Sequence, residues 1–578
     1  MSKTVADQLV EMLLQAGVKR VYAITGDSLN PVNAAIRSNG KLEWIHVRHE
    51  EVATYAASMD AELNGIGCCM GSSGPGHVHL INGLYDANRS GNPVIAIAST
   101  CPSHKFAQDY FQETNPYYLF QDCSKFVAVA NTAQQFPHMM QSAIQSAVSQ
   151  KGVAVLGLPG DVASAKAVAI PTSEISYVTS AVCRPNDSEL QKFADLLNQH
   201  KRITLYCGHG CQNAIEEVKT LASILQAPIC YTFRGKIFFD SDDNEYRAGL
   251  NGQLGYQSGY DACNQAEVLV MLGCDFPYAE FLPTKNKIVQ VDIKPERLGR
   301  RAKVDLGLAG DVGDTIRALL PLLQQHSDRT FLETMQQAFQ KSEANFAHYI
   351  EHKGAADHIQ PEYVAHLVSE LAADDAVITV DTGMTSVWAA RFIKRKKDRY
   401  LTGSFNHGSM ANAMPMAIGA AVSSPKQVVA LCGDGGLSML LGDLATIMQY
   451  KLPIKIILFN NRALGMVKLE MEVSGLVDWQ TDMVNPPFDK IAELMDIKGF
   501  AVHKTDEVEE AIKQAFAHEG PALVNIYTNS DALSLPPHPS LEQIRGFMTS
   551  MTKKLYAGEV ANVTDTAKSN LGHLKELF

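Results

Sequence analysis

The sequence predicts an α/β protein with three doubly wound parallel-sheet domains and a helical C-terminal tail. A chain of 578 residues is too long for one hydrophobic core. Short apolar runs rich in β-branched residues recur between longer helical stretches, as in alternating β and α layers. Several runs have no alternating polar face, which is typical of strands covered by helices on both sides. The runs are Val94–Ala98, Val153–Leu158, Ile203–Tyr206, Val268–Leu272, Ile288–Ile293, Ala376–Val380, Val428–Leu431, Ile454–Phe459 and Ala522–Ile526.

Two stretches rich in turn-forming residues predict linkers between the domains. Pro171–Asp187 is rich in Ser, Thr and Pro, and His352–Pro361 contains Gly, charged residues and a closing Pro. The three prolines within Leu535–Pro539 end regular structure a third time. We therefore expect domains at residues 1–182, 183–345 and 346–530, followed by a helical segment at 531–578.

Composition excludes several functional classes. The formal net charge of -12 disfavours a nucleic-acid-binding protein, because phosphate contacts need clustered Lys and Arg. The N-terminus lacks a signal-peptide pattern, and no apolar run reaches about 18 residues, so a cytoplasmic protein is expected. The 11 cysteines form no CxxC pair, which favours reduced, buried thiols over a thiolate metal site.

The most specific motif is Gly433-Asp434-Gly435-Gly436 after the predicted strand Val428–Leu431. Asn460-Asn461 ends the next predicted strand, and a helix at roughly Ser438–Tyr450 fits between them. Both motifs then lie at the carboxyl edge of a parallel sheet, where α/β folds bind ligands. Carboxylate and amide oxygens suit Mg²⁺, and glycines let the backbone approach a pyrophosphate. The alternative is a tight turn followed by an unrelated Asn-Asn turn.

This spacing resembles the signature of the thiamine-diphosphate enzyme family. The resemblance implies that Asp434, Asn461 and the Ala463 carbonyl bind Mg²⁺. It further implies a pyrimidine-binding N-terminal domain, a middle FAD-binding domain and a pyrophosphate-binding third domain. The cofactor contacts that it implies around the two motifs are Asp434, Gly435, Gly436, Asn461, Arg462, Ala463, Leu464, Gly465, Met466 and Val467.

Glu50 is the candidate activating carboxylate. It lies in Arg48-His49-Glu50-Glu51, ahead of the small-residue helix start Val52–Ala57. Acids at a helix N-terminus are favoured by the helix dipole, and that alone could explain them. The resemblance implies instead that Glu50, rather than Glu51, contacts the aminopyrimidine ring of a cofactor shared with a partner subunit. The family matches that support it are Thr25–Ser28, Gly74–Gly76 and Asn82–Leu84.

The segment Ser404–Pro415 matches the family region that contacts the aminopyrimidine. The resemblance implies contacts from His407, Gly408, Ser409 and Met410, with Met410 as the large apolar residue that holds the cofactor bent. Packing in the core is the alternative for Met410, and the two roles are compatible. For His49, His77 and His79, whose spacing matches no ordinary metal motif, structural or cofactor contacts are the expected roles.

Cys207-Gly208-His209-Gly210 lacks the third glycine of GxGxxG, so it is weak evidence for a dinucleotide. Resemblance to flavin-containing members of the family implies an FAD site in the middle domain. Asp292 ends a predicted strand, where a carboxylate would suit a ribose hydroxyl. The implied FAD contacts are Asn251, Gly252, Gln253, Leu254, Cys274, Asp275, Phe276, Pro277, Tyr278 and Asp292.

Along nearly the whole chain the resemblance is to quinone-dependent pyruvate oxidases, most specifically in Ser404–Pro415, Tyr110–Thr114 and Val387–Arg391. It implies oxidation of pyruvate to acetate and CO₂, with electrons passing through FAD to a membrane quinone, in a homotetramer. Phe111 and Gln112 would lie beside the thiazolium. Met466 stands where the family has a phenylalanine implicated in electron transfer, so the rate of that transfer is affected more than the reaction type.

Three alternatives stay open. They are an acetolactate synthase-type carboligase with non-redox FAD, an oxygen-dependent, phosphate-consuming pyruvate oxidase, and a catalytically retired flavoprotein that serves as a binding module. Intact Glu50, Asp434 and Asn461 argue against the last.

The C-terminal tail has a helical apolar stripe: Val560, Val563, Ala567, Leu571, Leu574 and Phe578. The resemblance implies that this segment binds the inner face of the cell membrane peripherally, whereas an ordinary docked helix is the alternative.

Overall fold

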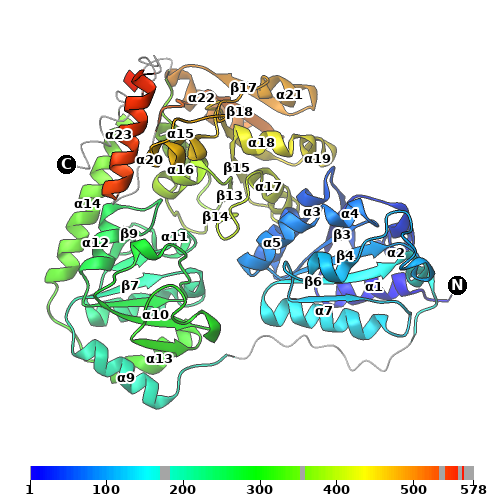
Figure 1. The fold of residues 1–578 in the computed structure, drawn as a ribbon, viewed down its shortest axis with the longest axis horizontal. Coiled ribbons are helices and arrows are strands. Elements are labelled where there is room, and N and C mark those ends of the chain that lie inside the picture. Colours follow the sequence, from blue (N-terminus) through cyan, green and yellow to red (C-terminus); the bar gives the residue numbers. More distant parts are fainter. Residues whose placement is uncertain are drawn as a thin grey trace.

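A computed structural model describes residues 2–168, 182–351, 358–532, 540–556, 563–564 and 566. It contains three six-stranded sheets in which every strand pair is parallel, and helices flank each sheet (Figure 1). The strand orders are β2-β1-β3-β4-β6-β5, β12-β11-β10-β7-β8-β9 and β14-β13-β15-β16-β18-β17. The predicted fold class is confirmed. We call the parts built around the three sheets domains 1, 2 and 3.

Domain 1 is blue to cyan in Figure 1. Its strands are β1 (Arg20–Ala23), β2 (Glu43–His46), β3 (Gly67–Gly71), β4 (Val94–Thr100), β5 (Phe126–Val129) and β6 (Val153–Pro159). Its α-helices are α1 (Val5–Gln15), α2 (Asn30–Asn39), α3 (Glu50–Asn64), α4 (Pro75–Val78), α5 (Ile81–Ser90), α6 (Pro116–Phe120), α7 (Phe136–Gln150) and α8 (Gly160–Ser164).

Domain 2 is green in Figure 1. Its strands are β7 (Ile203–Cys207), β8 (Ile229–Tyr231), β9 (Arg247–Leu250), β10 (Val268–Leu272), β11 (Lys287–Asp292) and β12 (Leu306–Ala309). Its α-helices are α9 (Asp187–Asn198), α10 (Ile215–Leu225), α11 (Lys236–Phe239), α12 (Gln257–Gln265), α13 (Val312–Leu319) and α14 (Thr330–Glu351). The predicted domain boundary at 345/346 falls inside α14, because the apolar positions of this helix continue past it.

Domain 3 is yellow to orange, and the red helix α23 (Leu541–Tyr556) packs on it (Figure 1). Its strands are β13 (Val377–Val380), β14 (Tyr400–Gly403), β15 (Val428–Gly433), β16 (Ile454–Phe459), β17 (Lys498–Val502) and β18 (Ala522–Ile526). Its other α-helices are α15 (Pro361–Leu371), α16 (Met384–Phe392), α17 (Ala413–Ser423), α18 (Asp434–Met439), α19 (Leu444–Tyr450), α20 (Gly465–Val473), α21 (Phe488–Leu494) and α22 (Val508–Ala517).

The single helix predicted at Ser438–Tyr450 is wrong in detail. The chain forms α18, a 3-10 turn at Leu441–Asp443, and then α19. The break lets the Asp443 carboxylate accept hydrogen bonds from the Arg48 backbone N–H (2.8 Å) and from the Thr446 hydroxyl (2.6 Å). Asp443 thereby joins domain 3 to the start of α3 in domain 1.

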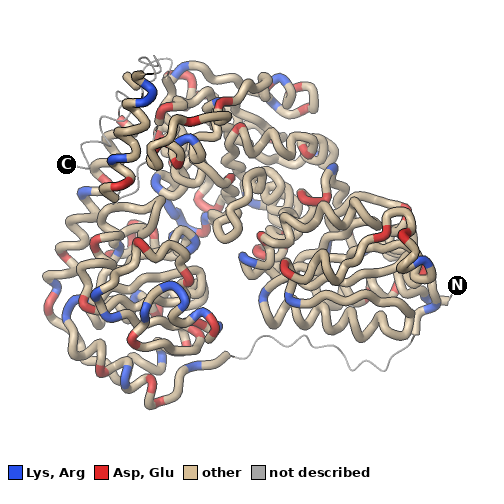
Figure 2. The backbone as a smooth tube through the Cα atoms, in the orientation of Figure 1, with Lys and Arg blue, Asp and Glu red and all other residues tan. Residues whose placement is uncertain are grey.

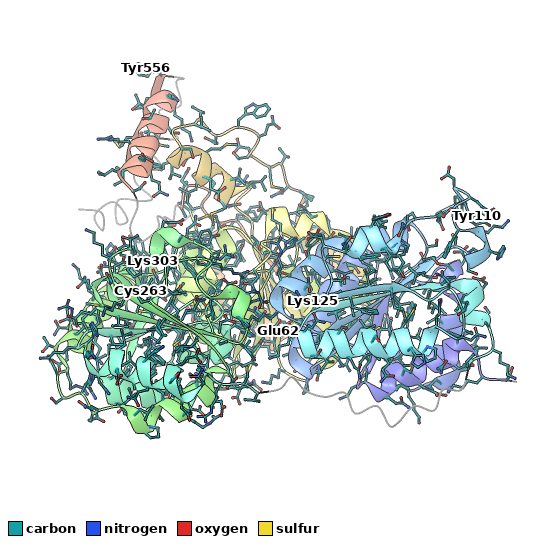
Figure 3. The ribbon with its side chains drawn as sticks, turned by 60° about the horizontal axis from the view of Figure 1, so that its bottom comes forward. Glu62, Tyr110, Lys125, Cys263, Lys303 and Tyr556 are labelled. Carbon is teal, nitrogen blue, oxygen red and sulfur yellow. The ribbon has the colours of Figure 1, made fainter. Side chains whose placement is uncertain are left out.

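Domains 1 and 3 of the same chain meet where α3 packs against α17. Both helices are rich in small buried residues, so their backbones approach closely. A β-carbon at Gly419 would overlap the Ala56 carbonyl oxygen across this contact. Around it, Tyr400 donates to Glu62 (2.7 Å) and Ser404 donates to Asp86 (2.7 Å). Figure 3 shows Glu62 at this junction.

Charged residues of both signs are interspersed over all three domains (Figure 2). Among the described helices, none is long and apolar enough to cross a membrane. Most of the predicted apolar stripe of the tail lies outside the described residues, which include only Val563 of its six members.

We predict that Gly419→Ala destabilises the protein by about 1–2 kcal/mol. Overlap with the Ala56 carbonyl costs roughly 1–3 kcal/mol, which exceeds the gain of about 0.5–1 kcal/mol in helix propensity. Urea-induced unfolding measures the change. The matched control is Gly442→Ala, since a β-carbon at Gly442 has no heavy atom within 4 Å. Equal stabilities of the two variants would contradict the close packing of α3 on α17.

Candidate active site

Asp434 lies at the carboxyl end of β15, as predicted, and its side chain is buried. Its Oδ1 accepts the Gly435 N–H (3.0 Å), and its Oδ2 accepts the Arg462 N–H (2.7 Å). Asn485 adds a third hydrogen bond, from Nδ2 to Oδ2 (2.6 Å). Burial raises the pKa of Asp434 despite these donors. A neighbouring cation would stabilise the charged carboxylate, so the environment suits a metal ion.

The Asn-Asn loop after β16 is held by a returning segment at residues 478–485. The Leu464 N–H donates to the Thr481 carbonyl (2.8 Å), and the Met483 N–H donates to the Arg462 carbonyl (2.8 Å). Ala463 and Asp482 form an antiparallel bridge between these two hydrogen bonds. We call residues 478–485 the return segment, since it fixes the loop that carries the Ala463 carbonyl.

Three predicted segments of domain 3 meet around Gly435. A β-carbon at this glycine would lie 3.0 Å from both Met410 Cε and Leu464 Cδ2. Gly436 is equally confined, because a β-carbon there would overlap the Asp381 carboxylate. The structure thus brings Met410, the Gly435-Gly436 pair and Leu464 together, at two positions where the close packing leaves no room for a β-carbon.

The donor set fits Mg²⁺. Asp434 provides one carboxylate, and Asn461 follows one residue after the buried Asn460. The Asn461 Oδ1 accepts the Ala463 N–H (3.1 Å), which holds these two expected ligands together. No group of three or more His, Cys, Asp or Glu that could hold a metal occurs among the described residues. A site with one carboxylate, one amide oxygen and one carbonyl agrees with that finding and with the oxygen preference of Mg²⁺.

Glu50 is the first residue of α3 and is only 6% exposed. Its Oε2 lies 2.9 Å from His79 Nδ1, and a β-carbon at Gly76 would lie 3.3 Å from its Oε1. His49 caps the helix by accepting the Glu51 N–H and stacks on His79 at 4.6 Å between ring centroids. Glu50 is therefore a buried, oriented carboxylate within domain 1.

Asn82 connects Glu51 to the predicted segment at His407. Its Nδ2 donates to Glu51 Oε1 (2.8 Å) and to Ser409 Oγ (3.0 Å), while its Oδ1 lies 3.0 Å from His407 Nε2. His407 also stacks on Tyr85, and burial lowers its pKa. His407 and Ser409 thus join domains 1 and 3 of one chain, and Gly408 (φ 79°) makes the turn between them.

Phe111 and Gln112 lie on a loop at the edge of domain 1. Phe111 is 77% exposed, and Gln112 adopts a left-handed backbone conformation (φ 61°). The Ser73 hydroxyl donates to the Gln112 carbonyl (3.0 Å), next to Gly74. Tyr110, one residue before Phe111, lies at the outer end of domain 1 in Figure 3, far from domain 3. A single chain therefore does not bring Phe111 and Gln112 to Asp434.

The predicted FAD segments lie at the carboxyl ends of the strands of domain 2. Gly208 and Gly210 follow β7 and approach Gly273 after β10 so closely that β-carbons at Gly208 and Gly210 would not fit. Gly252 (φ 116°) packs against the Phe276 ring, and the Asn251 Oδ1 is buried without a hydrogen-bond partner among the described residues. A glycine-lined edge with an unsatisfied acceptor fits a dinucleotide.

Charged residues complete this edge. Asp275 pairs with Arg300 and with Arg301 (3.4 Å), and the Asp292 Oδ1 accepts the Lys294 N–H (2.8 Å). Burial raises the pKa of Asp292. The remaining predicted contacts lie on the same segment. Cys274 is buried, whereas Tyr278, which follows Pro277, is 45% exposed.

Met466 lies between the predicted metal-binding loop and the predicted FAD segment. It lines a small cavity of about 30 Å³ together with Gln253 and Leu254 of the FAD segment and with Val387. The next residue, Val467, is 40% exposed. The loop that carries Asn461 and Gly465 therefore borders directly on the predicted flavin segment.

Sequence reasoning missed Asn485 and Asp381. Asn485 lies just before Pro486-Pro487, outside every motif that the sequence analysis identified, yet it contacts both Asp434 and Asn460 (2.9 Å). Asp381 follows β13 and accepts the N–H groups of Ala413 (2.9 Å) and Gly433 (3.3 Å). Burial raises its pKa to about 7. Its position at a strand end was a usable signal.

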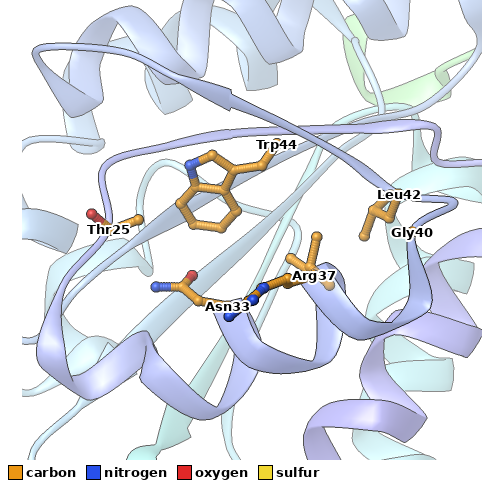
Figure 4. A pocket seen from close by; sticks show the side chains of 7 residues that line it. Thr25, Asn33, Arg37, Gly40, Leu42 and Trp44 are labelled. Atoms are coloured by element: carbon orange, nitrogen blue, oxygen red, sulfur yellow. The ribbon is translucent and has the colours of Figure 1, made fainter.

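A separate cavity of about 350 Å³ lies in domain 1 between α2 and β2 (Figure 4). Trp44, Asn33 and Arg37 line it, and only Thr25 comes from a segment with a family match. None of the predicted catalytic residues borders this cavity, so it is not the candidate active site.

Comparison with known proteins agrees with this geometry. Residues 3–119 match the N-terminal TPP binding domain of thiamine pyrophosphate enzymes, residues 190–319 the central domain, and residues 381–526 the C-terminal TPP binding domain. The chain is 34% identical to the "Putative thiamine pyrophosphate-containing protein YdaP" of Bacillus subtilis, over 100% of both chains. It is 30% identical to the pyruvate oxidase of Lactiplantibacillus plantarum, over 90% of this chain and 88% of the relative. It is 28% identical to acetolactate synthase 2 of Brassica napus, over 93% of this chain and 87% of the relative.

We predict that Asp434→Ala weakens the binding of Mg²⁺ and thiamine diphosphate together, because the ion connects the protein to the pyrophosphate. The loss should exceed the roughly 10–100-fold that outer-shell changes cause. Isothermal titration of the FAD-containing protein with thiamine diphosphate and Mg²⁺ measures it. Asp482→Ala, an exposed carboxylate in the return segment, is the control, and FAD content should not change. Normal cofactor affinity in Asp434→Ala would contradict the metal role.

Proposed function

Because the chain belongs to the thiamine pyrophosphate enzyme family, we propose that it oxidises pyruvate to acetate and CO₂ and passes the electrons through FAD to a membrane quinone. The cofactors are thiamine diphosphate, Mg²⁺ and FAD. The observation that carries the proposal is the cavity shared by Met466, Gln253 and Leu254, because it makes the metal-binding loop adjoin the flavin segment.

Bound thiamine diphosphate supplies an electron sink for decarboxylation of a 2-oxo acid, and FAD accepts the electron pair. Asp434, Asn461 and the Ala463 carbonyl hold the ion that fixes the pyrophosphate. Glu50 would face the aminopyrimidine ring, and His79 orients its carboxylate from 2.9 Å. Met410, which lies beside Gly435, would pack against the bound cofactor.

A second copy of the chain completes each site in this proposal. The Glu50 carboxylate contacts His79 of its own domain, and Phe111 is exposed at the outer edge of domain 1. Around the metal loop, Met439, Trp479 and Val484 are also exposed, with Trp479 at 74%. Covering these apolar side chains with domain 1 of a partner would bring Glu50 and Phe111 to the cofactor. Two such dimers give the proposed homotetramer.

The test is anaerobic reduction of the bound flavin by pyruvate. In the wild type we expect pyruvate to bleach the flavin, and in Glu50→Gln we expect the rate to fall by about 10²–10⁴-fold, the usual contribution of a proton-transfer group. Stopped-flow absorbance measures both rates. Glu51→Gln is the matched control. It should slow flavin reduction much less, because Glu51 accepts a hydrogen bond from Asn82 and not from His79.

Other outcomes identify the alternatives. A flavin that stays oxidised while acetolactate forms would indicate a carboligase, the activity named for the Brassica relative. Flavin reduction with phosphate consumed to form acetyl phosphate, followed by reoxidation of the flavin by oxygen, would indicate the oxygen-dependent enzyme. No reaction of any kind with a saturated cofactor set would indicate a binding module. Near-normal flavin reduction in Glu50→Gln would remove Glu50 from its role.

We also propose that the protein attaches peripherally to the inner face of the cell membrane and is cytoplasmic in its resting state. The apolar stripe of the tail supports the attachment to the membrane. The last residue described in α23, Tyr556, is 90% exposed, and Met548 on the same helix is 63% exposed. Charges in the tail are mixed, so burial of apolar side chains has to dominate over attraction to anionic lipid.

We predict that deleting residues 558–578 abolishes pyruvate-stimulated binding to liposomes, while activity with a soluble electron acceptor survives or rises. Co-sedimentation with vesicles measures binding. Liposome binding that persists in the truncated protein would show that the membrane contact lies elsewhere. Aggregation or loss of FAD would favour a docked structural helix instead.

A further inference from the structure

Helix α23 packs along α20, the helix that follows the metal-binding loop (Figure 1). The two helices are closest at Gly546, where a β-carbon would overlap the Val473 carbonyl oxygen. On the following turns of α23, Ser550 donates to the Leu476 carbonyl (2.7 Å) and Lys553 to the Gly475 carbonyl (2.8 Å). Hydrogen bonds therefore hold α23 against the residues that directly follow α20.

Lys554 is a buried lysine, 3% exposed, at the end of this contact. Its Nζ donates to Glu472 Oε1 (2.6 Å) and pairs with Asp478 Oδ1. Glu472 is fully buried, and its second oxygen has no hydrogen-bond partner among the described residues. One ammonium group thus pairs with two carboxylates, one on α20 and one on the first residue of the return segment. Its two partners keep the pKa of Lys554 above its usual value.

The contact continues from Asp478 to the metal site. The Thr481 hydroxyl donates to Asp478 (3.2 Å), and the Thr481 carbonyl accepts the Leu464 N–H. At the far end of the return segment, Asn485 holds Asp434 and Asn460. Hydrogen bonds at both ends of the return segment, together with its backbone, therefore connect Lys554 with both sides of the proposed Mg²⁺ site.

Removing the ammonium group would leave Glu472 and Asp478 as two neighbouring carboxylates, with Lys468, which also pairs with Asp531 (3.4 Å), as the cation that still acts on both. Like charges in a buried environment repel strongly, and the group free to move is Asp478, on a segment without regular structure. Displacement of Asp478 loosens Thr481, and with it the ladder that fixes the Ala463 carbonyl.

We propose that Lys554 is a positioning residue for the Mg²⁺ and thiamine diphosphate site, acting through Asp478 and the return segment. Helix α23 then determines cofactor affinity although it provides no ligand. The proposal rests on the metal role of Asp434, and it is independent of the substrate and of the electron acceptor.

The test measures Mg²⁺-dependent binding of thiamine diphosphate by titration calorimetry, without pyruvate. Lys554→Met keeps the length of the side chain and removes its charge, and we expect binding to weaken by about tenfold, the lower end for outer-shell changes. The matched control Lys553→Met removes the neighbouring lysine, which contacts only the Gly475 carbonyl, and should leave affinity unchanged. FAD content reports whether each variant is folded.

A double-variant cycle separates positioning from general destabilisation. Asn485→Ala removes the contact of the return segment with Asp434, so adding Lys554→Met should weaken binding little further.

Unchanged affinity in FAD-replete Lys554→Met overturns the proposal, and so do fully additive effects in the cycle. If Lys554→Met loses FAD, Glu472→Gln with Lys554→Met restores the charge balance on α20. The repulsion between the two carboxylates is absent in this pair, but Asp478 still lacks its ammonium partner, so cofactor affinity should recover only in part, and wild-type affinity in it also overturns the proposal. Normal cofactor affinity in Asp434→Ala would remove the metal site on which both proposals rest, whereas absent flavin reduction by pyruvate with normal cofactor binding would contradict the proposed function alone.

Discussion

The site depends on the burial of one carboxylate, Asp434, at the end of a central strand. Burial disfavours the charged form, and three hydrogen-bond donors do not fully offset it, so the pKa is raised. A bound cation offsets the part of the desolvation cost that these donors leave. Two of these donors, Arg462 and Asn485, come from the loop after the neighbouring strand and from the return segment, so the arrangement of both segments depends on this one side chain. Glycines at 435 and 436 keep its surroundings open.

The sequence predicted the centre of the fold better than its edges. All nine apolar runs became strands, since central strands such as β10 and β16 are buried on both faces and read as continuous hydrophobic segments. The missed strands include every sheet edge. Short or half-exposed segments such as β2 and β17 carry no comparable pattern. In the site, motif spacing identified Asp434 and Asn461, whereas Asn485 could not be found, because its role follows from a tertiary contact 51 residues away in sequence.

The position of Glu50 bears on the proposed sharing of the site between two copies. Its carboxylate is oriented within domain 1, while the contacts between domains 1 and 3 of the same chain pass through Asn82, His407 and Ser409. These contacts fix the two domains against each other, so that domain 1 presents Glu50 and the exposed Phe111 as a rigid surface. The packing of α3 on α17 therefore stabilises the chain, and in the proposed dimer it would also hold rigid the surface that meets a second copy.

Complementation between inactive variants tests most directly that the site is built from Glu50 of one copy and Asp434 of another. Glu50→Gln and Asp434→Ala proteins are mixed, allowed to exchange subunits and assayed for pyruvate-dependent flavin reduction. Half of the randomly exchanged dimers are mixed, and each mixed dimer has one intact site of two, so recovery of about one quarter of the wild-type amplitude is predicted. Failure to recover activity after verified subunit exchange would contradict the account, because both residues would then be needed from the same chain.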